Sequence, residues 1–334
     1  MKELKNYLLG DYRDMMRRIE HTHRYGAAKL PPLIITCAVT GGNQGAEANP
    51  AIPETLEDQV QACYDAYNAG ASMVHIHRRD PNNLADVTER WEDYLEVNHY
   101  VREKCPDLII NNTIIGCHNI DMETGRIGDP LSVSLEARPE VGSLDIYATS
   151  GRLPLKPRLP PLSPRSGPPY REYNFYMPAS TCIDMTNKLK ERGIVPEWEI
   201  FDMGNLKLLN AMIAQGVAEA PYWMQVAFGP SGIPASPEKL LDATMTMPGK
   251  SLMSVLAVGA CQTVMATMAI LMGHHVRVGL EDNIYYHYGE LASSNAQMVE
   301  RIVRIAKELG REIATPEEAR AMIGLGAPRA YDLP

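Results

Sequence analysis

Eight short apolar runs alternate with longer amphipathic segments along most of the chain. Runs of this length, rich in aliphatic residues, are typical of strands that are buried on both faces. They begin near Leu33, Ser72, Leu108, Gly142, Glu197, Trp223, Ser251 and His275. Helical periodicity separates them, most clearly at residues 54–70, 185–193, 205–216 and 295–312. This alternation predicts an α/β fold with a parallel sheet closed into a (β/α)8 TIM barrel.

Several segments lie outside this repeat. We predict a charged, helical N-terminal extension at residues 1–27, the barrel at residues 28–320 and a C-terminal tail at residues 321–334. A Pro- and Arg-rich insertion interrupts the barrel at about residues 151–175. An open, doubly wound sheet is the alternative fold. No G-x-G-x-x-G turn follows the first strand, which favours the barrel.

Composition and charge narrow the class of protein. The 334 residues are 45% hydrophobic, enough for a large core, and the net charge of −9 argues against non-specific binding to nucleic acid or to an anionic membrane. No apolar run approaches the roughly 18 residues of a membrane span. The six cysteines contain no C-x-x-C pair, so neither a disulfide framework nor a cysteine zinc site is indicated. We expect a cytoplasmic protein with a small-molecule substrate.

Two histidines close the second predicted strand in an H-x-H pattern. Side chains alternate across a strand, so His75 and His77 point to one face, at the barrel end where active sites lie. Two adjacent imidazoles suit a zinc ion, which in catalytic sites takes three protein ligands and keeps one position open. We therefore expect a metal site here. Histidines satisfied by hydrogen bonds at the barrel mouth are the alternative.

The last predicted strand, HVRVGLED, brings charged residues to the same region. Alternation places Arg277 and Glu281 on its inner face, and Asp282 follows at its end. The last strand of a closed barrel flanks the first, as the second strand does, so Glu281 is a candidate third ligand. A structural ion network is the alternative. Because sites of this composition also take iron or cobalt, the metal itself stays open.

Other strands offer further polar side chains. Glu197 and Glu199 share one face of the fifth strand, where each is either a substrate contact or part of the polar filling of the barrel. Thr113 and Ser143 lie on the third and fourth strands and are candidate hydrogen-bond donors to a substrate carboxylate. None of these four residues is distinctive alone.

The order of several motifs is specific to one family. The sequence resembles the β-keto acid cleavage enzymes between about Leu33 and Glu318, in the segments ITCAVTGG, MVHIHRRDP, VPEWEIFDMG, VRVGLEDN and SNAQMVERIVRIAKELGRE. This resemblance implies a zinc-dependent (β/α)8 barrel, usually a homotetramer. It also implies the reaction of a β-keto acid with acetyl-CoA, by Claisen and retro-Claisen chemistry, to give acetoacetate and a new acyl-CoA.

The resemblance implies roles for single residues as well. Carried over by position, the metal ligands are His75, His77 and Glu281. Asp282, oriented by Arg277, is then the general base. Thr113 lies where the family has a serine that contacts substrate, and Ser143 where it has a threonine, so both positions keep a hydroxyl.

One position departs from the family pattern. Amine-binding members have T-G-A-E where this sequence has T-G-G-N, so Asn43 replaces a glutamate suited to a cationic substrate tail. We predict that Asn43 contacts a keto acid that lacks a primary ammonium at that place. Glu47, four residues later, is the alternative source of the missing charge.

The insertion and the overall activity leave alternatives open. The basic residues of the insertion are Arg152, Lys156, Arg158, Arg165 and Arg171. They indicate either an arm at an oligomer interface or a basic lid near the phosphates of CoA. The same barrel mouth also fits a zinc aldolase or hydrolase that works without CoA, or a non-catalytic metal-binding barrel. The last of these has no need of the Arg277–Asp282 pair.

Overall fold

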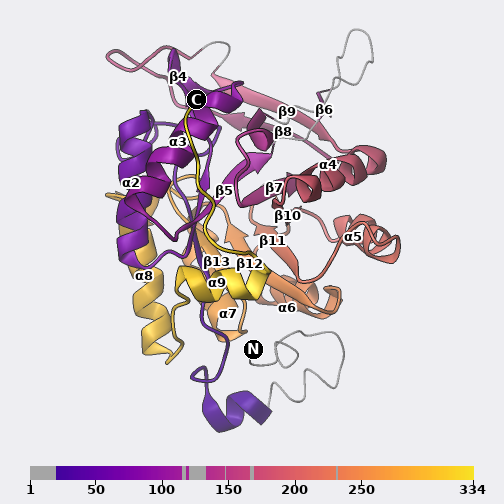
Figure 1. The fold of residues 1–334 in the computed structure, drawn as a ribbon. Helices are drawn as coiled ribbons and strands as arrows, with labels where there is room; N and C mark the ends of the chain where they lie inside the picture. The colour runs from indigo at the N-terminus through magenta and orange to yellow at the C-terminus, as the bar shows by residue number, and fades with distance from the viewer. Residues whose placement is uncertain (1–19, 115–117, 120–132, 147, 166–168, 231) are drawn as a thin grey trace.

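Eight parallel strands form a closed barrel at the centre of the molecule (Figure 1). The computed structural model describes residues 20–114, 118–119, 133–146, 148–165, 169–230 and 232–334. The barrel strands are β1 (Ile35–Ala38), β2 (Met73–Ile76), β5 (Ile109–Ile114), β7 (Val141–Asp145), β10 (Val195–Ile200), β11 (Tyr222–Phe228), β12 (Ser251–Ala257) and β13 (His275–Val278). Because β1 pairs with both β2 and β13, the predicted neighbours of the first strand are confirmed.

Helices cover the outside of the barrel (Figure 1). They are α2 (Leu56–Ala69), α3 (Trp91–Lys104), α4 (Ala179–Glu191), α5 (Asn205–Ala214), α6 (Pro237–Thr246), α7 (Gln262–Leu271), α8 (Asn295–Glu308) and α9 (Pro316–Ile323), with short 3-10 turns η2 (Val133–Leu135) and η3 (Gly259–Cys261). Each presents an apolar side to the strands, as α8 does with Met298, Val299 and Ile302. Among the described residues, no helix combines the length and the apolar character needed to cross a membrane.

The barrel interior is layered, because side chains alternate along each strand. Its floor is apolar and includes Ile34, Met73, Ile109, Val141, Trp223 and Leu252. Two residues further along the same strands, the buried side chains are polar: Thr36, His75, Asn111, Ser143, Gln225 and Ser254. A larger apolar cluster packs between the barrel and the helices. The polar layer therefore leads from the floor to the C-terminal mouth, where His77 lies.

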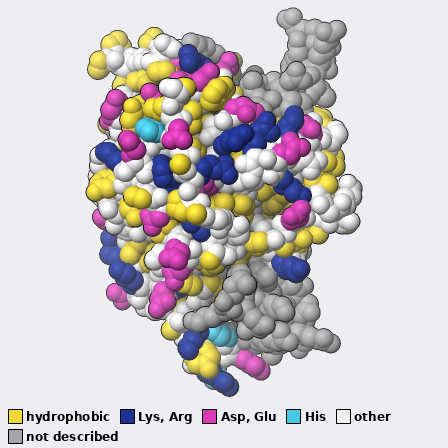
Figure 2. Space-filling model, in the orientation of Figure 1, with side chains coloured by type: hydrophobic (Ala, Val, Ile, Leu, Met, Phe, Trp, Pro, Cys, Tyr) yellow, Lys and Arg dark blue, Asp and Glu magenta, His cyan; other side chains and the backbone are white. Residues whose placement is uncertain are grey.

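The C-terminal tail closes the opposite end of the barrel. α9 contributes buried apolar side chains to the floor and crosses the predicted boundary at residue 320. After it, Tyr331 is buried, and Arg329 donates to the carbonyl oxygens of Arg138 and Gly193. A cavity of about 310 Å³ lies between the tail and the loops before β7 and β10. Figure 2 shows Lys and Arg side chains gathered above the centre of the face that it draws. The C-terminal tail runs over this same face in Figure 1.

The insertion forms a hairpin beside the barrel mouth. β8 (Ala148–Pro154) and β9 (Tyr170–Tyr176) pair antiparallel, and β6 (His118–Asn119) joins them in a three-stranded sheet. Two small hairpins, β3 (Arg79–Asp80) with β4 (Asn83–Val87) and β14 (Tyr285–His287) with β15 (Glu290–Leu291), follow β2 and β13. Of the predicted N-terminal extension, residues 20–25 are helical, and the others up to residue 19 lie outside the described part.

Candidate active site

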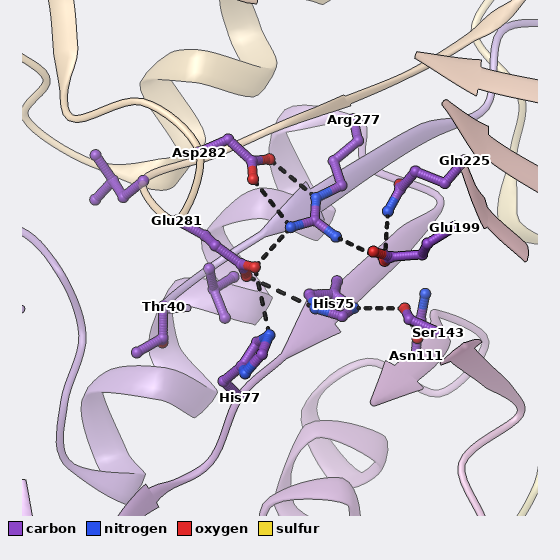
Figure 3. A network of polar contacts seen from close by, with 12 residues as sticks. Thr40, His75, His77, Asn111, Ser143, Glu199, Gln225, Arg277, Glu281 and Asp282 are labelled. Carbon is purple, nitrogen blue, oxygen red and sulfur yellow. Dashed lines mark hydrogen bonds and ion pairs between the residues drawn. The ribbon is translucent and has the colours of Figure 1, made fainter. Parts of the chain in front are cut away.

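Two histidines and a glutamate converge at the barrel mouth (Figure 3). His75 Nε2 lies 3.7 Å from one carboxylate oxygen of Glu281, and His77 Nε2 lies 3.3 Å from the other. One candidate ligand atom from each of the three residues lies within 4.8 Å of the other two. The three side chains that the sequence offered as metal ligands therefore lie together.

Glu281 reaches this place by a different route from the predicted one. β13 ends at Val278, so Glu281 lies on a turn rather than on the strand. Gly279 makes the turn possible with a φ of +137°, and a Cβ there would lie 2.1 Å from the carbonyl oxygen of Ala38. Only glycine fits such a conformation and such an approach. The turn swings Glu281 and Asp282 over the open end of the barrel.

Burial and neighbouring charges set the protonation of these side chains. Burial, with help from the positive charge of Arg277, lowers the pKa of His75 well below its ordinary range. Burial opposes ionisation of Glu281, but Arg277, His77 and His75 outweigh it and hold the pKa of its carboxyl well below the usual value. A neutral imidazole and an ionised carboxylate are the forms that bind a metal.

The hydrogen bonding of this cluster is incomplete in a way that fits a cation. Among the described residues, Oε2 of Glu281 and Nδ1 of His77 are buried without a hydrogen-bond partner. Buried polar atoms almost always have partners, and an unmet acceptor at a metal-like cluster is accounted for by an ion. Two imidazoles and one carboxylate form the ligand set of several catalytic zinc sites. The residues therefore fit a zinc ion or a similar divalent metal.

A charged cluster adjoins these three residues (Figure 3). Arg277 donates to both oxygens of Asp282, at 2.9 and 3.0 Å, and to Glu281 at 2.6 Å. Its remaining terminal nitrogen lies 3.7 Å from Glu199, which accepts a hydrogen bond from Gln225. Burial raises the pKa of Asp282 to about 6, although Arg277 acts in the opposite direction. The cluster holds a carboxylate that can exchange a proton near neutral pH.

A chain of hydrogen bonds connects His75 with Ser143 and Glu197. Ser143 Oγ lies 3.1 Å from Nδ1 of His75 and 2.8 Å from a carboxylate oxygen of Glu197. Glu197 also accepts hydrogen bonds from Asn111 and Trp223. If Nδ1 carries the proton, it donates to Ser143, which donates to Glu197. That arrangement leaves Nε2 free to bind a metal, as second partners of metal-binding histidines commonly do.

The other predicted substrate contacts, Thr113 and Asn43, lie in different parts of the barrel mouth. Thr113 is paired in register with Ser143 and follows Asn111 on the inner side of β5. Asn43 is exposed on the loop after β1, where its main-chain oxygen accepts a hydrogen bond from Arg165. Sequence reasoning overlooked Asn111. The alternation in IINNTI, which puts the first asparagine on the same face as Thr113, contains that signal.

Known proteins are similar in sequence to this chain over most of its length. The profile of the family described as beta-keto acid cleavage enzyme matches residues 32–325. The 3-keto-5-aminohexanoate cleavage enzyme of Fusobacterium nucleatum is 36% identical over 298 residues, which are 89% of this chain and 99% of that protein. The 3-dehydrocarnitine:acetyl-CoA trimethylamine transferase of Rhizobium meliloti is 29% identical over 310 residues, covering 88% and 96%.

A solved structure gives a likeness of fold. The apo structure of ObcA matches with a TM-score of 0.60 at 17% identity, over 83% of this chain and 66% of that one. The family profile, by contrast, spans the barrel from before β1 to beyond α9. The relative from Fusobacterium is similar over almost its whole length. The chain therefore belongs to the beta-keto acid cleavage enzyme family.

Proposed function

We propose that this protein is a zinc-dependent enzyme that converts a β-keto acid and acetyl-CoA into acetoacetate and a new acyl-CoA. The observation that carries the proposal is the cluster of His75, His77 and Glu281 beside the Arg277–Asp282 pair. The names of the relatives, which include acetyl-CoA transferases, support the choice of co-substrate.

The metal would be held by His75, His77 and Glu281, with Ser143 and Glu197 orienting the first histidine. When bound, a divalent cation there supplies a Lewis acid that polarises a carbonyl oxygen and leaves a position open for substrate. The chain's own contribution is to keep the imidazole of His75 neutral and the carboxylate of Glu281 ionised. The pKa shifts of His75 and Glu281 go in those directions.

Asp282 would take a proton from the carbon between the keto and carboxylate groups of the β-keto acid. The resulting carbanion attacks the thioester carbonyl of acetyl-CoA, a carbon–carbon bond forms and the CoA thiolate leaves. The thiolate then attacks the original keto carbon, and the bond between that carbon and the deprotonated carbon breaks. That carbon leaves with the bonding electron pair and takes back the proton held by Asp282, so the products are acetoacetate and the new acyl-CoA and all atoms balance. Deprotonation of the acetyl methyl group instead would not give acetoacetate.

Arg277 would serve this chemistry in two ways. Its paired hydrogen bonds fix the orientation of Asp282, and its charge would stabilise the negative charge that develops on a substrate deprotonated by Asp282. With a pKa of about 6, Asp282 is mostly ionised at neutral pH and still basic enough to accept a proton. Glu199 would hold the far side of the guanidinium.

Incubation of the purified enzyme with a panel of β-keto acids and acetyl-CoA labelled with ¹³C in both acetyl carbons tests the proposal. We expect acetoacetate labelled only at its keto and methyl carbons, together with an unlabelled new acyl-CoA. Cleavage that proceeds without acetyl-CoA would identify an aldolase or hydrolase instead. A protein that binds metal but turns over no member of the panel would support a non-catalytic barrel.

We also propose that the enzyme forms a homo-oligomer, with a tetramer as the expected state. On α7, the side chains of Val264 and Leu271 are 60% and 49% exposed, and Leu241 of the neighbouring α6 is 48% exposed. We infer that these exposed apolar side chains on two neighbouring helices belong to a surface between subunits. Light scattering coupled to size-exclusion chromatography measures the mass, and the 37.0 kDa mass of a single chain would contradict the proposal.

A further inference from the structure

The centre of the insertion lies on the loop that follows β1. We call residues 155–165 the strap and residues 39–55 the mouth loop. Arg158 of the strap donates to both carboxylate oxygens of Glu54, at 2.7 and 2.9 Å, and to one oxygen of Glu47. Arg165 donates to the other oxygen of Glu47 at 2.6 Å. Two strap arginines thus bind two mouth-loop acids.

These four side chains are withdrawn from solvent. The side chain of Arg158 is 1% exposed, that of Glu47 is 2% and that of Glu54 is 7%. Burial opposes ionisation of Glu47, but the hydrogen bond from Arg165 prevails and lowers the pKa of its carboxyl. A buried ion pair that loses one partner leaves an uncompensated charge, which strongly destabilises its surroundings. The mouth loop in this conformation therefore depends on the strap.

The same loop packs directly against the proposed metal ligands. A Cβ at Gly41 would lie 2.6 Å from Cγ of Glu281, and one at Gly42 would lie 3.4 Å from Nδ1 of His77. Gly41 also has a φ of +72°, which suits glycine. The main chain of the loop thus lies against two of the three ligands, and a shift of the loop would change the space around them.

The ion cluster begins only a few residues after that contact. A Cβ at Gly45 would lie 2.0 Å from Oε1 of Glu54 and 2.6 Å from Arg158. The amide of Gly45 donates to Glu47 and the amide of Ala46 donates to Glu54. The carboxylates of Glu47 and Glu54 therefore bind the backbone of the mouth loop as well as the arginines of the strap.

The segment between the glycines and the ion cluster is held from two sides. The buried Arg79 donates to the carbonyl oxygen of Gln44, and Arg165 donates to that of Asn43. Both oxygens of Glu47 are occupied by strap arginines. Glu47 is therefore already paired with Arg158 and Arg165 and is not a free carboxylate for a cationic substrate tail.

We propose that Arg158 is a positioning residue that holds the mouth loop against His77 and Glu281 by neutralising Glu47 and Glu54. The kinetic part of this inference rests on the proposed function, because it assumes that the β-keto acid binds beside this loop. The structural part does not. It requires only that the loop loosens when Arg158 is lost.

The main test compares Arg158→Met with the wild type by hydrogen exchange at the amides of Gly45 and Ala46, and by steady-state kinetics. We expect faster exchange at both amides and a KM for the β-keto acid raised by about tenfold or more, with a smaller change in kcat and with metal content kept. Arg158→Lys, which keeps the charge but not the paired geometry, should lie between the two. Arg90→Met, which removes an arginine that is 64% exposed, should change neither measurement.

A triple variant with Arg158→Met, Glu47→Gln and Glu54→Gln separates charge from shape. Removing the two unpaired carboxylates should bring exchange and KM back towards the wild type, because no charge is left buried. Unchanged exchange and KM in both Arg158→Met and Arg158→Lys would overturn the inference. So would a triple variant as impaired as Arg158→Met. If the wild type makes no acetoacetate, the proposed function fails, and the exchange data still decide the role of Arg158.

Discussion

Replacing Asp282 with asparagine keeps the shape of the side chain and removes its ability to take a proton. Asp282 is buried and accepts two hydrogen bonds from Arg277. Asparagine can accept one of them through its oxygen, but its amide group then faces a guanidinium N–H, donor against donor. Arg277 keeps its contacts with Glu281 and Glu199, so its side chain should stay in place.

The expected magnitude has two parts. Losing a charge-assisted hydrogen bond to a buried group costs about 1.5–3 kcal/mol in unfolding free energy, partly offset because a buried negative charge is also removed. Losing a positioned general base lowers kcat by roughly two to four powers of ten, or about 2.7–5.4 kcal/mol of activation free energy. The catalytic effect should therefore exceed the effect on stability.

The assay measures acetoacetate formation with saturating acetyl-CoA, zinc content per chain, and exchange of solvent deuterium into the carbon next to the keto group. Asp282→Asn should lose both turnover and exchange while retaining the metal. Asp184→Asn, which removes an exposed acid on α4, serves as the control. If the variant kept its turnover, the assignment of the base would be wrong. If zinc were lost together with activity, Asp282 would be a ligand.

Three further outcomes are expected. Ser143→Ala should weaken metal binding by about 10- to 100-fold, measured by competition with a chelator, because Nδ1 of His75 loses its partner; a raised KM with unchanged metal affinity would instead indicate a substrate contact. Chelation should abolish turnover, and added zinc should restore it; full activity without metal would refute the proposed centre. Folding lowers the pKa of Glu47 from its ordinary value of 4.5. Its carboxylate therefore stabilises the folded protein above pH 4.5, and this stabilisation is lost as the pH falls through the pKa of the folded state. The difference in unfolding free energy between wild type and Glu47→Gln should shrink below that pH in denaturant titrations, and a constant difference would contradict this.

The sequence located the barrel because its strands are buried on both faces. Such strands are continuous apolar runs, and each run begins within two residues of a barrel strand. Alternation also predicted that His75 and His77 point to the same side, although β2 itself ends at Ile76 and His77 is the next residue. These features depend on neighbours in the chain, so a single sequence contains them.

Other features depend on contacts between distant residues. The placement of Glu281 requires the conformation of Gly279 against the carbonyl of Ala38, which no periodicity encodes. The strap was visible as a basic, proline-rich segment, but its acidic partners Glu47 and Glu54 lie more than 100 residues earlier. Neither expected role of the strap included pairing within its own chain.

The seam between β1 and β13 has a consequence for synthesis of the protein. It joins residues 241 positions apart, as the contact between Ile34 and His275 shows, and Glu281 follows directly after it. During translation, His75 and His77 leave the ribosome early. Glu281 follows only when nearly the whole chain has been made. Binding of the proposed metal ion should thus come late in synthesis, and a shortened translation product without the final strand should not bind it.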